Sequence, residues 1–142
     1  MSSIVFSRLA PTPSGYLHFG NAFNFLLTRL LVDYQGGHLH LRIDDLDGSR
    51  VERSSVEDIF GQLEWFGIDY DSGPSGPDEL YSKFSQQLRK ERYHESLELL
   101  HKSGHLFACE CSRSEIRQLS LNRNYPGTCR DKTVSYTHLP SP

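Results

Sequence analysis

Residues 8–21 read R-L-A-P-T-P-S-G-Y-L-H-F-G-N, and this stretch decides how the chain around it folds. The apolar run before it, residues 4–9, has the length and composition of a buried strand. The Pro, Ser and Gly residues of 10–16 predict a loop, and a helix is expected to begin near His18. A cation at Arg8, an imidazole and free N–H groups of a helix start therefore lie in one region. Such a region suits a ligand that carries carboxylate and phosphate groups.

The periodicity downstream predicts a helix that ends at Gly36, followed by a strand over residues 38–43. The buried face of that helix is expected to hold the apolar residues that recur at helical spacing: Phe23, Leu26, Leu27, Leu30, Leu31 and Tyr34. Ser54 with Glu57 predicts a capping box for the next helix. Its buried stripe is expected to contain Val56, Ile59, Phe60, Leu63 and Phe66.

Further along, residues 67–78 are rich in Gly, Pro, Asp and Ser and predict an exposed loop. Residues 85–103 predict a polar amphipathic helix that Gly104 ends, and residues 106–108 predict a short strand. Ser112 with Glu115 is a second capping box, for a helix that runs to about residue 121. The order of elements indicates an α/β fold with a parallel sheet, in which ligands bind beyond the carboxyl ends of the strands.

Composition limits the class of protein. The chain has 142 residues, 37% of them hydrophobic and 23% charged, which is typical of a globular protein. It contains no apolar run long enough to span a membrane and begins without a secretory signal, so we expect a cytoplasmic protein. Residues 1–111 carry 10 Lys and Arg against 16 Asp and Glu, whereas residues 112–142 carry 5 against 2. The basic part is either a solvated surface, which charge alone favours, or a contact for a phosphate backbone.

Two further clusters carry chemistry. L-R-I-D-D-L-D, residues 41–47, places three carboxylates beside Arg42 at a strand end, which suits an ammonium group or a metal; a solvated acidic turn is the alternative. Cys109, Cys111 and Cys129 fall within 21 residues and can supply three zinc ligands, or they are unliganded thiols.

The pattern R-x-A-P-T-P-S-G-x-L-H-F-G resembles, over thirteen positions, the signature of glutamyl-type class I aminoacyl-tRNA synthetases, with H-F-G-N in the place of the HIGH motif. L-R-I-D-D-L-D is similar to the L-R-I-E-D-x-D of that family. The chain departs from the family at Asn21, where the motif name has a second histidine, and at Asp44, where Glu is usual. The S-Q-Q-L-R-K-E-R-Y stretch of residues 85–93 also resembles the family, and we assign it to packing.

The resemblance implies the first half of a Rossmann-like catalytic domain over residues 1–104, a small zinc-binding insertion over 105–130, and an unassigned tail, 131–142, that is truncated or artefactual. It implies ATP-dependent activation of glutamate, with Mg²⁺ neutralising the phosphates, and transfer to tRNA. His18 and Gly20 are then the catalytic residues. The implied glutamate contacts are Arg8, Leu9, Ala10, Pro11, Thr12 and Asp44. The implied ATP contacts are Pro11, His18, Gly20 and Asn21.

The cysteine cluster is similar to the Cys-x-Cys and Tyr-x-x-x-Cys pattern of glutamyl-queuosine tRNA(Asp) synthetases. By that resemblance Cys109, Cys111, Tyr125 and Cys129 bind Zn²⁺, and the acceptor is the queuosine base of tRNA(Asp). A conventional glutamyl-tRNA synthetase and a non-catalytic zinc-stabilised RNA-binding fragment are the alternatives. The lysine-containing ATP loop of the family has no K-x-S-K counterpart in this chain, so we expect little adenylate synthesis by it alone. A monomer is expected.

Overall fold

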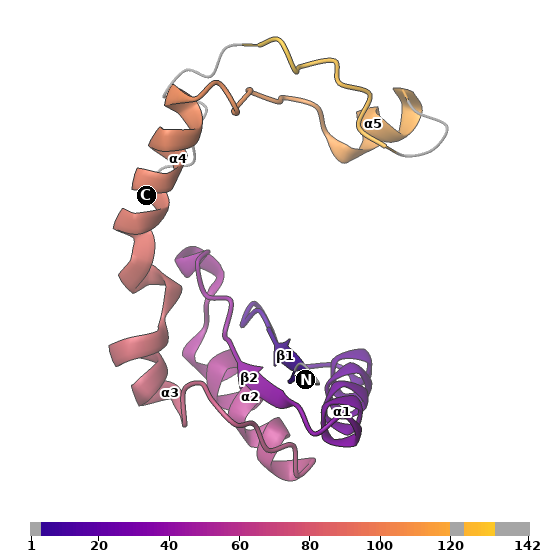
Figure 1. Cartoon of the computed structure of the whole chain (residues 1–142), viewed down its shortest axis with the longest axis vertical. Coiled ribbons are helices and arrows are strands. Elements are labelled where there is room, and N and C mark those ends of the chain that lie inside the picture. The colour runs from indigo at the N-terminus through magenta and orange to yellow at the C-terminus, as the bar shows by residue number, and fades with distance from the viewer. Residues whose placement is uncertain (1–3, 120–123, 133–142) are drawn as a thin grey trace. The chain divides into compact units, whose positions relative to one another are not determined.

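The computed structural model describes residues 4–119 and 124–132. The chain divides into two compact units, Met1–Arg89 and Lys90–Pro142, and each is described by itself (Figure 1). Of the predicted segments, the tail beyond residue 132 lies outside the described residues. The predicted divisions after residues 104 and 130 stay predictions.

The first unit is built on two parallel strands, β1 (Phe6–Leu9) and β2 (His38–Leu41), joined by the helix α1 (Phe19–Tyr34). Their register pairs Phe6 with His38 and Leu9 with Leu41. Beyond the strands the pairing continues, because Arg42 N donates to Leu9 O (2.9 Å) and Asp44 N donates to Pro11 O (2.9 Å). The predicted parallel arrangement is confirmed, and the continued pairing brings Asp44 to the loop that precedes α1.

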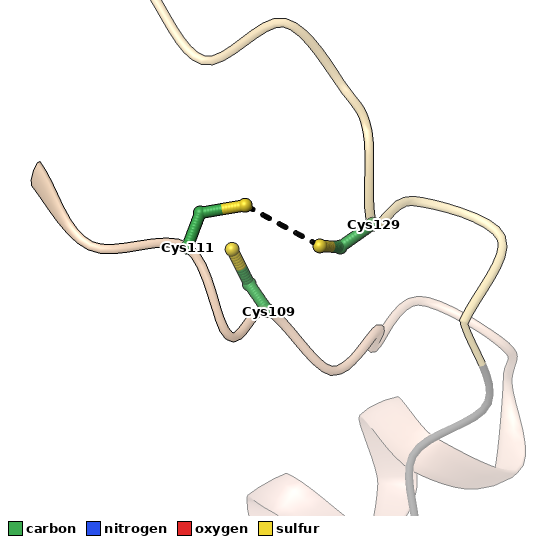
Figure 2. Close-up of side chains that lie close together, drawn as sticks. All are labelled: Cys109, Cys111 and Cys129. Carbon is green, nitrogen blue, oxygen red and sulfur yellow. Dashed lines mark hydrogen bonds between the residues drawn. The ribbon is translucent and has the colours of Figure 1, made fainter. Parts of the chain in front are cut away.

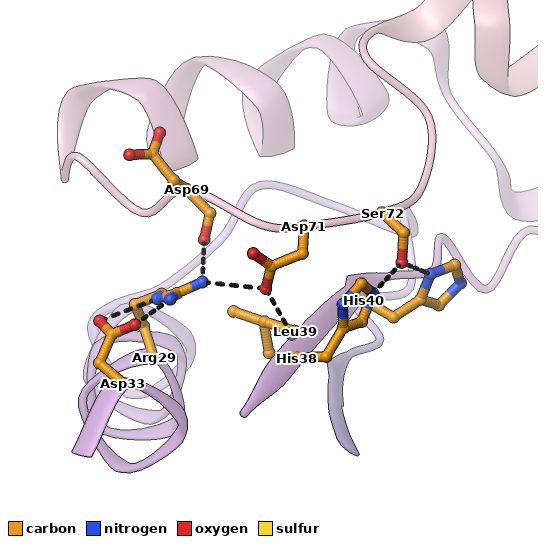
Figure 3. A network of polar contacts seen from close by, with 8 residues as sticks. All are labelled: Arg29, Asp33, His38, Leu39, His40, Asp69, Asp71 and Ser72. Carbon is orange, nitrogen blue, oxygen red and sulfur yellow. Dashed lines mark hydrogen bonds and ion pairs between the residues drawn. The ribbon is translucent and has the colours of Figure 1, made fainter. Parts of the chain in front are cut away.

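Residues 69–74 form a loop as predicted, but this loop runs along the free edge of β2 and only part of it is exposed. Asp71 N donates to Leu39 O (2.8 Å), and Leu41 N donates to Ser72 O (2.8 Å). Figure 3 shows Ser72 Oγ between the imidazoles of His38 (2.8 Å) and His40 (2.9 Å). The two backbone hydrogen bonds, from Asp71 N and from Leu41 N, satisfy groups that a sheet edge would otherwise expose.

Close approach of this segment to β2 requires glycine at position 73. A Cβ atom there would lie 2.3 Å from Leu41 O, and the backbone has φ +127°. Both the contact and the dihedral exclude an ordinary side chain.

The helix α1 packs on the sheet through a different face from the one predicted. Ala22, Phe25 and Val32 are buried, whereas most of the predicted row is exposed: Phe23, Leu27, Leu30, Leu31 and Tyr34. Apolar residues occupy more than one face of α1, so helical spacing alone fits two orientations. The narrow sheet covers only the stripe that contains Phe25 and Val32.

The helix α2 (Arg53–Trp65) buries Val56, Ile59 and Leu63 as predicted. The predicted capping box at Ser54 is wrong, because α2 begins at Arg53 with Glu52 at the N-cap position. Glu57 instead accepts a hydrogen bond from Arg53 Nε at 3.0 Å. A short 3-10 helix, η1 (Gly48–Arg50), precedes α2.

Several short turns, rather than one helix, connect α2 to the second unit. They are α3 (Pro77–Glu79), the π-helical turn η2 (Leu80–Phe84) and the 3-10 helix η3 (Gln86–Arg89). The continuous α-helix α4 (Lys90–Lys102) starts only after them. The predicted helix over 85–103 is therefore split, because residues 85–87 donate hydrogen bonds to Asp45, in the segment that follows β2, and these bonds hold the backbone there.

In the second unit, α4 ends where Gly104 adopts φ +72°. The predicted capping box of α5 (Arg113–Leu119) is confirmed: Glu115 N donates to Ser112 Oγ (3.2 Å), and Ser112 N donates to Glu115 Oε2 (2.6 Å). Residues 106–108, which are all described, form no strand, because no neighbouring strand pairs with them. None of the helices in the described ranges is long and apolar enough to cross a membrane.

Candidate active site

A cavity of about 600 Å³ opens at the carboxyl end of β1 and the start of α1. It brings together seven of the predicted site residues: Arg8, Leu9, Ala10, Pro11, Thr12, His18 and Asn21. Sequence reasoning missed further lining residues on α1, Asn24 and Thr28 among them. Gly20 and Asp44 are not part of the lining.

His18 is the N-cap residue of α1 as well as a lining residue of the cavity. Its Nδ1 accepts a hydrogen bond from Gly20 N (3.1 Å), and Asn21 Oδ1 accepts one from His18 N (3.1 Å), so the two side chains form a capping box. An Nδ1 atom that accepts a hydrogen bond carries no proton, so in the neutral ring the proton is on Nε2. The cap therefore leaves Nε2–H as the donor of the imidazole.

Gly20 allows this cap to form. A Cβ atom at position 20 would lie 3.0 Å from His18 Cε1 and 3.1 Å from His18 Nδ1. The sequence predicted a free N–H group at Gly20 for a phosphate, but this group donates to the imidazole. The contribution of Gly20 that the geometry shows is space for His18.

The loop before His18 is held by α2. Asp58 Oδ2 accepts a hydrogen bond from Leu17 N (3.0 Å), and Gln62 Nε2 donates to Asp58 Oδ1 (3.3 Å). Asp58 was not singled out from the sequence, because an acidic residue on a helix ordinarily faces solvent. Its contact across 41 positions of the chain carries no local sequence signal.

The cation at the cavity is available to a ligand. Within the described part of the chain, the exposed Arg8 guanidinium takes part in no ion pair. A planar guanidinium can hold a carboxylate through two parallel hydrogen bonds. The cavity thus combines a free cation at β1 with the imidazole donor at α1.

Asp44 lies next to this cavity and is already hydrogen-bonded. Arg42 Nε donates to Asp44 Oδ1 (2.6 Å) and the Arg42 terminal nitrogen donates to Asp44 Oδ2 (3.0 Å). Gln86 Nε2 donates to Asp44 Oδ1 (2.9 Å). Arg42 is thus paired with a neighbouring acid, and the Asp44 side chain keeps 30% of its surface exposed.

The three thiols of the second unit converge, as Figure 2 shows. The Sγ atoms of Cys109, Cys111 and Cys129 all lie within 4.8 Å of one another, and those of Cys111 and Cys129 are 3.5 Å apart. Tetrahedral zinc with Zn–S bonds of about 2.3 Å requires sulfurs about 3.8 Å apart, so this spacing fits a zinc ion. The Tyr125 hydroxyl is beside the cluster and accepts a hydrogen bond from Cys129 N (2.8 Å).

One thiol of the cluster ionises near neutral pH, as a metal ligand must. Hydrogen bonds from the Glu110 N–H and the Cys111 thiol lower the pKa of Cys129 to about 7, so its thiolate forms near neutral pH. Desolvation raises the pKa of Tyr125, so its hydroxyl stays protonated unless a cation binds beside it.

Comparison with known proteins shows which family this chain resembles. The sequence model of the class I tRNA synthetases (E and Q), catalytic domain, matches residues 4–138. A glutamyl-Q tRNA(Asp) synthetase from Nitratidesulfovibrio vulgaris is 38% identical over 136 residues, which are 89% of this chain and 41% of that protein. A glutamate–tRNA ligase from Desulfosudis oleivorans is 37% identical over 137 residues, 92% of this chain and 27% of that protein.

A solved structure is similar as well. The glutamate–tRNA synthetase of Elizabethkingia anophelis superposes with a TM-score of 0.63 at 30% identity, over 84% of this chain and 24% of that one. The chain thus spans less than half the length of these relatives. The matched range and the identities show that the chain belongs to the class I tRNA synthetases of the E and Q type, within their catalytic domain.

Proposed function

We propose that this chain supplies the glutamate-binding and nucleotide-binding part of an enzyme that activates glutamate with ATP and transfers it to tRNA. The observation that carries the proposal is the cavity in which the free Arg8 cation and the His18 imidazole meet at the carboxyl end of β1. Class I membership supports the reaction type. A cation suits the carboxylates of glutamate, and the imidazole suits a phosphate oxygen.

The proposed reaction has two balanced steps. In the first step, an oxygen of the glutamate α-carboxylate forms a bond to the α-phosphorus of ATP. The bond between that phosphorus and the oxygen bridging to the β-phosphorus breaks, and pyrophosphate leaves. An acceptor hydroxyl on the tRNA then forms an ester with the activated carbonyl carbon, its proton is released, and AMP leaves. Because both steps transfer groups between charged partners, the contribution of the protein is positioning and electrostatic stabilisation.

The residues have distinct parts in this proposal. Arg8 holds a carboxylate of glutamate, and Asp44 accepts its α-ammonium group. The Nε2–H of His18 donates to an oxygen of the α-phosphate as charge builds up there. Leu9, Ala10, Pro11, Thr12 and Asn21 shape the cavity around the amino acid and the nucleotide. Mg²⁺ would bind with ATP and neutralise its phosphates.

We further propose that Cys109, Cys111, Cys129 and Tyr125 hold a structural Zn²⁺ ion. The convergence of the three Sγ atoms and the low pKa of Cys129 support it. When bound, the ion would hold the two loop segments that carry the ligands, 109–111 and 125–129, next to each other. A tyrosine as the fourth ligand favours the queuosine base of tRNA(Asp) as the acceptor. The Nitratidesulfovibrio relative, a glutamyl-Q tRNA(Asp) synthetase, supports that choice.

A ligand-binding experiment on the 142-residue chain tests the amino-acid and nucleotide site. We expect a non-hydrolysable glutamyl-adenylate analogue to bind in calorimetry, and the aspartyl analogue to bind at least tenfold more weakly. Arg8→Ala should weaken binding at least tenfold, since hydrogen bonds to charged groups contribute about 1.5–3 kcal/mol each. Arg50→Ala, which removes an exposed arginine outside the lining, is the matched control and should bind normally. Equal binding of both analogues would contradict the proposal.

A further inference from the structure

A buried carboxylate at position 45, in the segment after β2, is hydrogen-bonded to the turn that begins at Ser85. Asp45 is 1% exposed. Its Oδ2 accepts a hydrogen bond from Ser85 Oγ (2.5 Å), and its Oδ1 accepts one from Gln86 N (2.7 Å). A buried charge persists only when hydrogen bonds compensate its desolvation, so these contacts fix the backbone at residues 85 and 86 relative to β2.

The turn that Asp45 holds carries Gln86, whose side chain reaches the neighbouring acid. Gln86 Nε2 donates to Asp44 Oδ1 at 2.9 Å across 42 positions of the chain. The next residue, Gln87, has a different role, because its Nε2 donates to the backbone oxygens of Asp45 (2.6 Å) and Leu46 (2.6 Å). Of the two adjacent glutamines, Gln86 thus contacts a side-chain carboxylate, whereas Gln87 contacts only the backbone.

The contacts of Asp44 leave one side of its carboxylate for a ligand. Oδ1 accepts from Arg42 Nε and from Gln86 Nε2, whereas Oδ2 accepts only from the Arg42 terminal nitrogen among the described residues. A carboxylate has about four acceptor positions, two on each oxygen, so the remaining one is on Oδ2. Gln86 therefore fills Oδ1 and directs the carboxylate to accept a further donor through Oδ2.

We infer that Gln86 is a positioning residue for recognition of the substrate ammonium group, acting through Asp44 and held in place by Asp45. The inference rests on the proposed function, because it assigns the remaining acceptor of Asp44 to the α-ammonium of glutamate. The aspartate at position 44 has a short side chain with two rotatable bonds. Fixing one oxygen from the opposite side keeps the other oxygen in place before the ligand binds.

The test compares glutamate with glutarate, which has the same two carboxylates but no ammonium group. The ¹⁵N-labelled 142-residue chain is titrated with each compound, and the dissociation constants are obtained from NMR shifts. We expect the unmodified chain to prefer glutamate. Gln86→Met, which keeps the length but removes the donor, should reduce that preference about 3- to 10-fold and leave glutarate affinity unchanged.

Two more variants make the result specific. Gln86→Asn retains the amide on a side chain too short to reach Asp44 and should show the same loss of preference. Gln87→Met removes two hydrogen bonds from the same turn without touching Asp44, so it is the matched control and should keep the preference of the unmodified chain. The amide spectrum of each variant reports whether the fold is retained.

The outcomes separate this inference from the proposed function. If the unmodified chain prefers glutamate and both Gln86 variants keep that preference, the inference fails and the proposed function stands. If Gln87→Met loses the preference as much as Gln86→Met, the role of Gln86 is structural and the inference also fails. If the unmodified chain binds glutamate no better than glutarate, the proposed ammonium site at Asp44 fails, and the inference fails with it.

Discussion

At the scale of single residues, His18 both caps the helix α1 and lines the cavity of the candidate site. Its Nδ1 closes the first turn of α1, and that contact sets the proton on Nε2 in the neutral ring. The imidazole therefore cannot turn over to offer its other nitrogen without breaking the cap. Two properties of the site, ring orientation and tautomer, are fixed before any ligand arrives.

Replacing Gly20 by alanine tests this arrangement. The new methyl group would lie about 3 Å from the imidazole, so we expect Gly20→Ala to displace His18 and to weaken binding of the glutamyl-adenylate analogue at least fivefold. Loss of a cap costs about 1 kcal/mol, which cancels the helical preference for alanine of about 0.5–1 kcal/mol, so we expect no gain in stability. Calorimetry and urea denaturation measure the two effects.

The matched control is Gly61→Ala in α2, where an added Cβ meets nothing within 4 Å. It should leave analogue binding unchanged and raise the free energy of unfolding by about 0.5–1 kcal/mol. Unchanged analogue binding by Gly20→Ala would contradict the role given to the capped His18.

The pH dependence of stability follows from His40. Burial is the main cause that lowers the pKa of His40, and the charges of His38, Arg42, Arg89 and Arg8 lower it further. An unfolded histidine has a pKa of about 6.5, so below that pH the unfolded state binds the proton more readily. The free energy of unfolding should be constant above about pH 6.5 and fall as the pH drops toward the lowered folded pKa.

Urea denaturation between pH 7.5 and 5 measures this decline. His40→Gln should reduce it, because the group whose pKa differs between the two states is gone. The exposed His94 in α4 offers the control, and His94→Gln should show the same pH dependence as the unmodified chain. A decline that is identical in His40→Gln would assign it to other groups.

At the scale of elements, the segment along β2 depends on a single glycine. Gly73→Ala would place a methyl group 2.3 Å from Leu41 O at a φ of +127°. We expect it to destabilise the first unit by at least about 2 kcal/mol, since backbone strain and an enforced contact act together. Gly76→Ala, with φ 177° and nothing within 4 Å, should change stability by less than about 0.5 kcal/mol. Equal urea midpoints for the two variants would contradict this account of the close approach.

Elements were more predictable from the sequence than the faces they bury. The strands predicted over 4–9 and 38–43 are found, in shorter form, at 6–9 and 38–41, and the predicted start of α1 near His18 is confirmed. The buried face of α1 was predicted wrongly because the apolar residues of that helix lie on more than one of its faces. The pairing of residues 69–74 with β2 depends on contacts some thirty positions apart, which a loop-like composition hides.

In the candidate site, too, the residues that are close in sequence were predictable, and those brought together by long-range contacts were not. The lining of the cavity from Arg8 to Asn21 is contiguous in the sequence, so motif reasoning found most of it. Asp58 escaped it. Asp45 and Gln86 lie in motifs that were singled out, but their roles were missed, because each of the three acts through a hydrogen bond to a residue about 40 positions away. Their residue types are common on helix and turn surfaces, and only the fold shows which of them face inward.

At the scale of the whole molecule, the two units differ in what stabilises them. The first has a cluster of buried apolar side chains around Leu39, Leu41 and Ile59. In the second unit, the buried residues within the described part are Ala108 and Cys129. A core of this size contributes little to the stability of the fold. We therefore expect the folding of the second unit to depend on the proposed zinc ion.

We therefore expect a chelator to increase amide hydrogen exchange in residues 105–119 and 124–132 and to leave residues 4–85 unchanged, as measured by mass spectrometry. Cys129→Ser should lose the bound metal in elemental analysis. Thr128→Val changes the neighbouring residue without removing a ligand and should retain the metal. Metal content that is the same in Cys129→Ser and in the unmodified chain would contradict the zinc site.

The capped histidine also means that two kinds of selection act differently on position 18. Asn, Asp and Ser are good N-cap residues, so a library selected only for folded protein should accept them there. None of them offers an imidazole N–H in the same place, so a library selected for binding of the glutamyl-adenylate analogue should reject them. A single substitution at position 18 is thus expected to give a folded chain without the proposed binding.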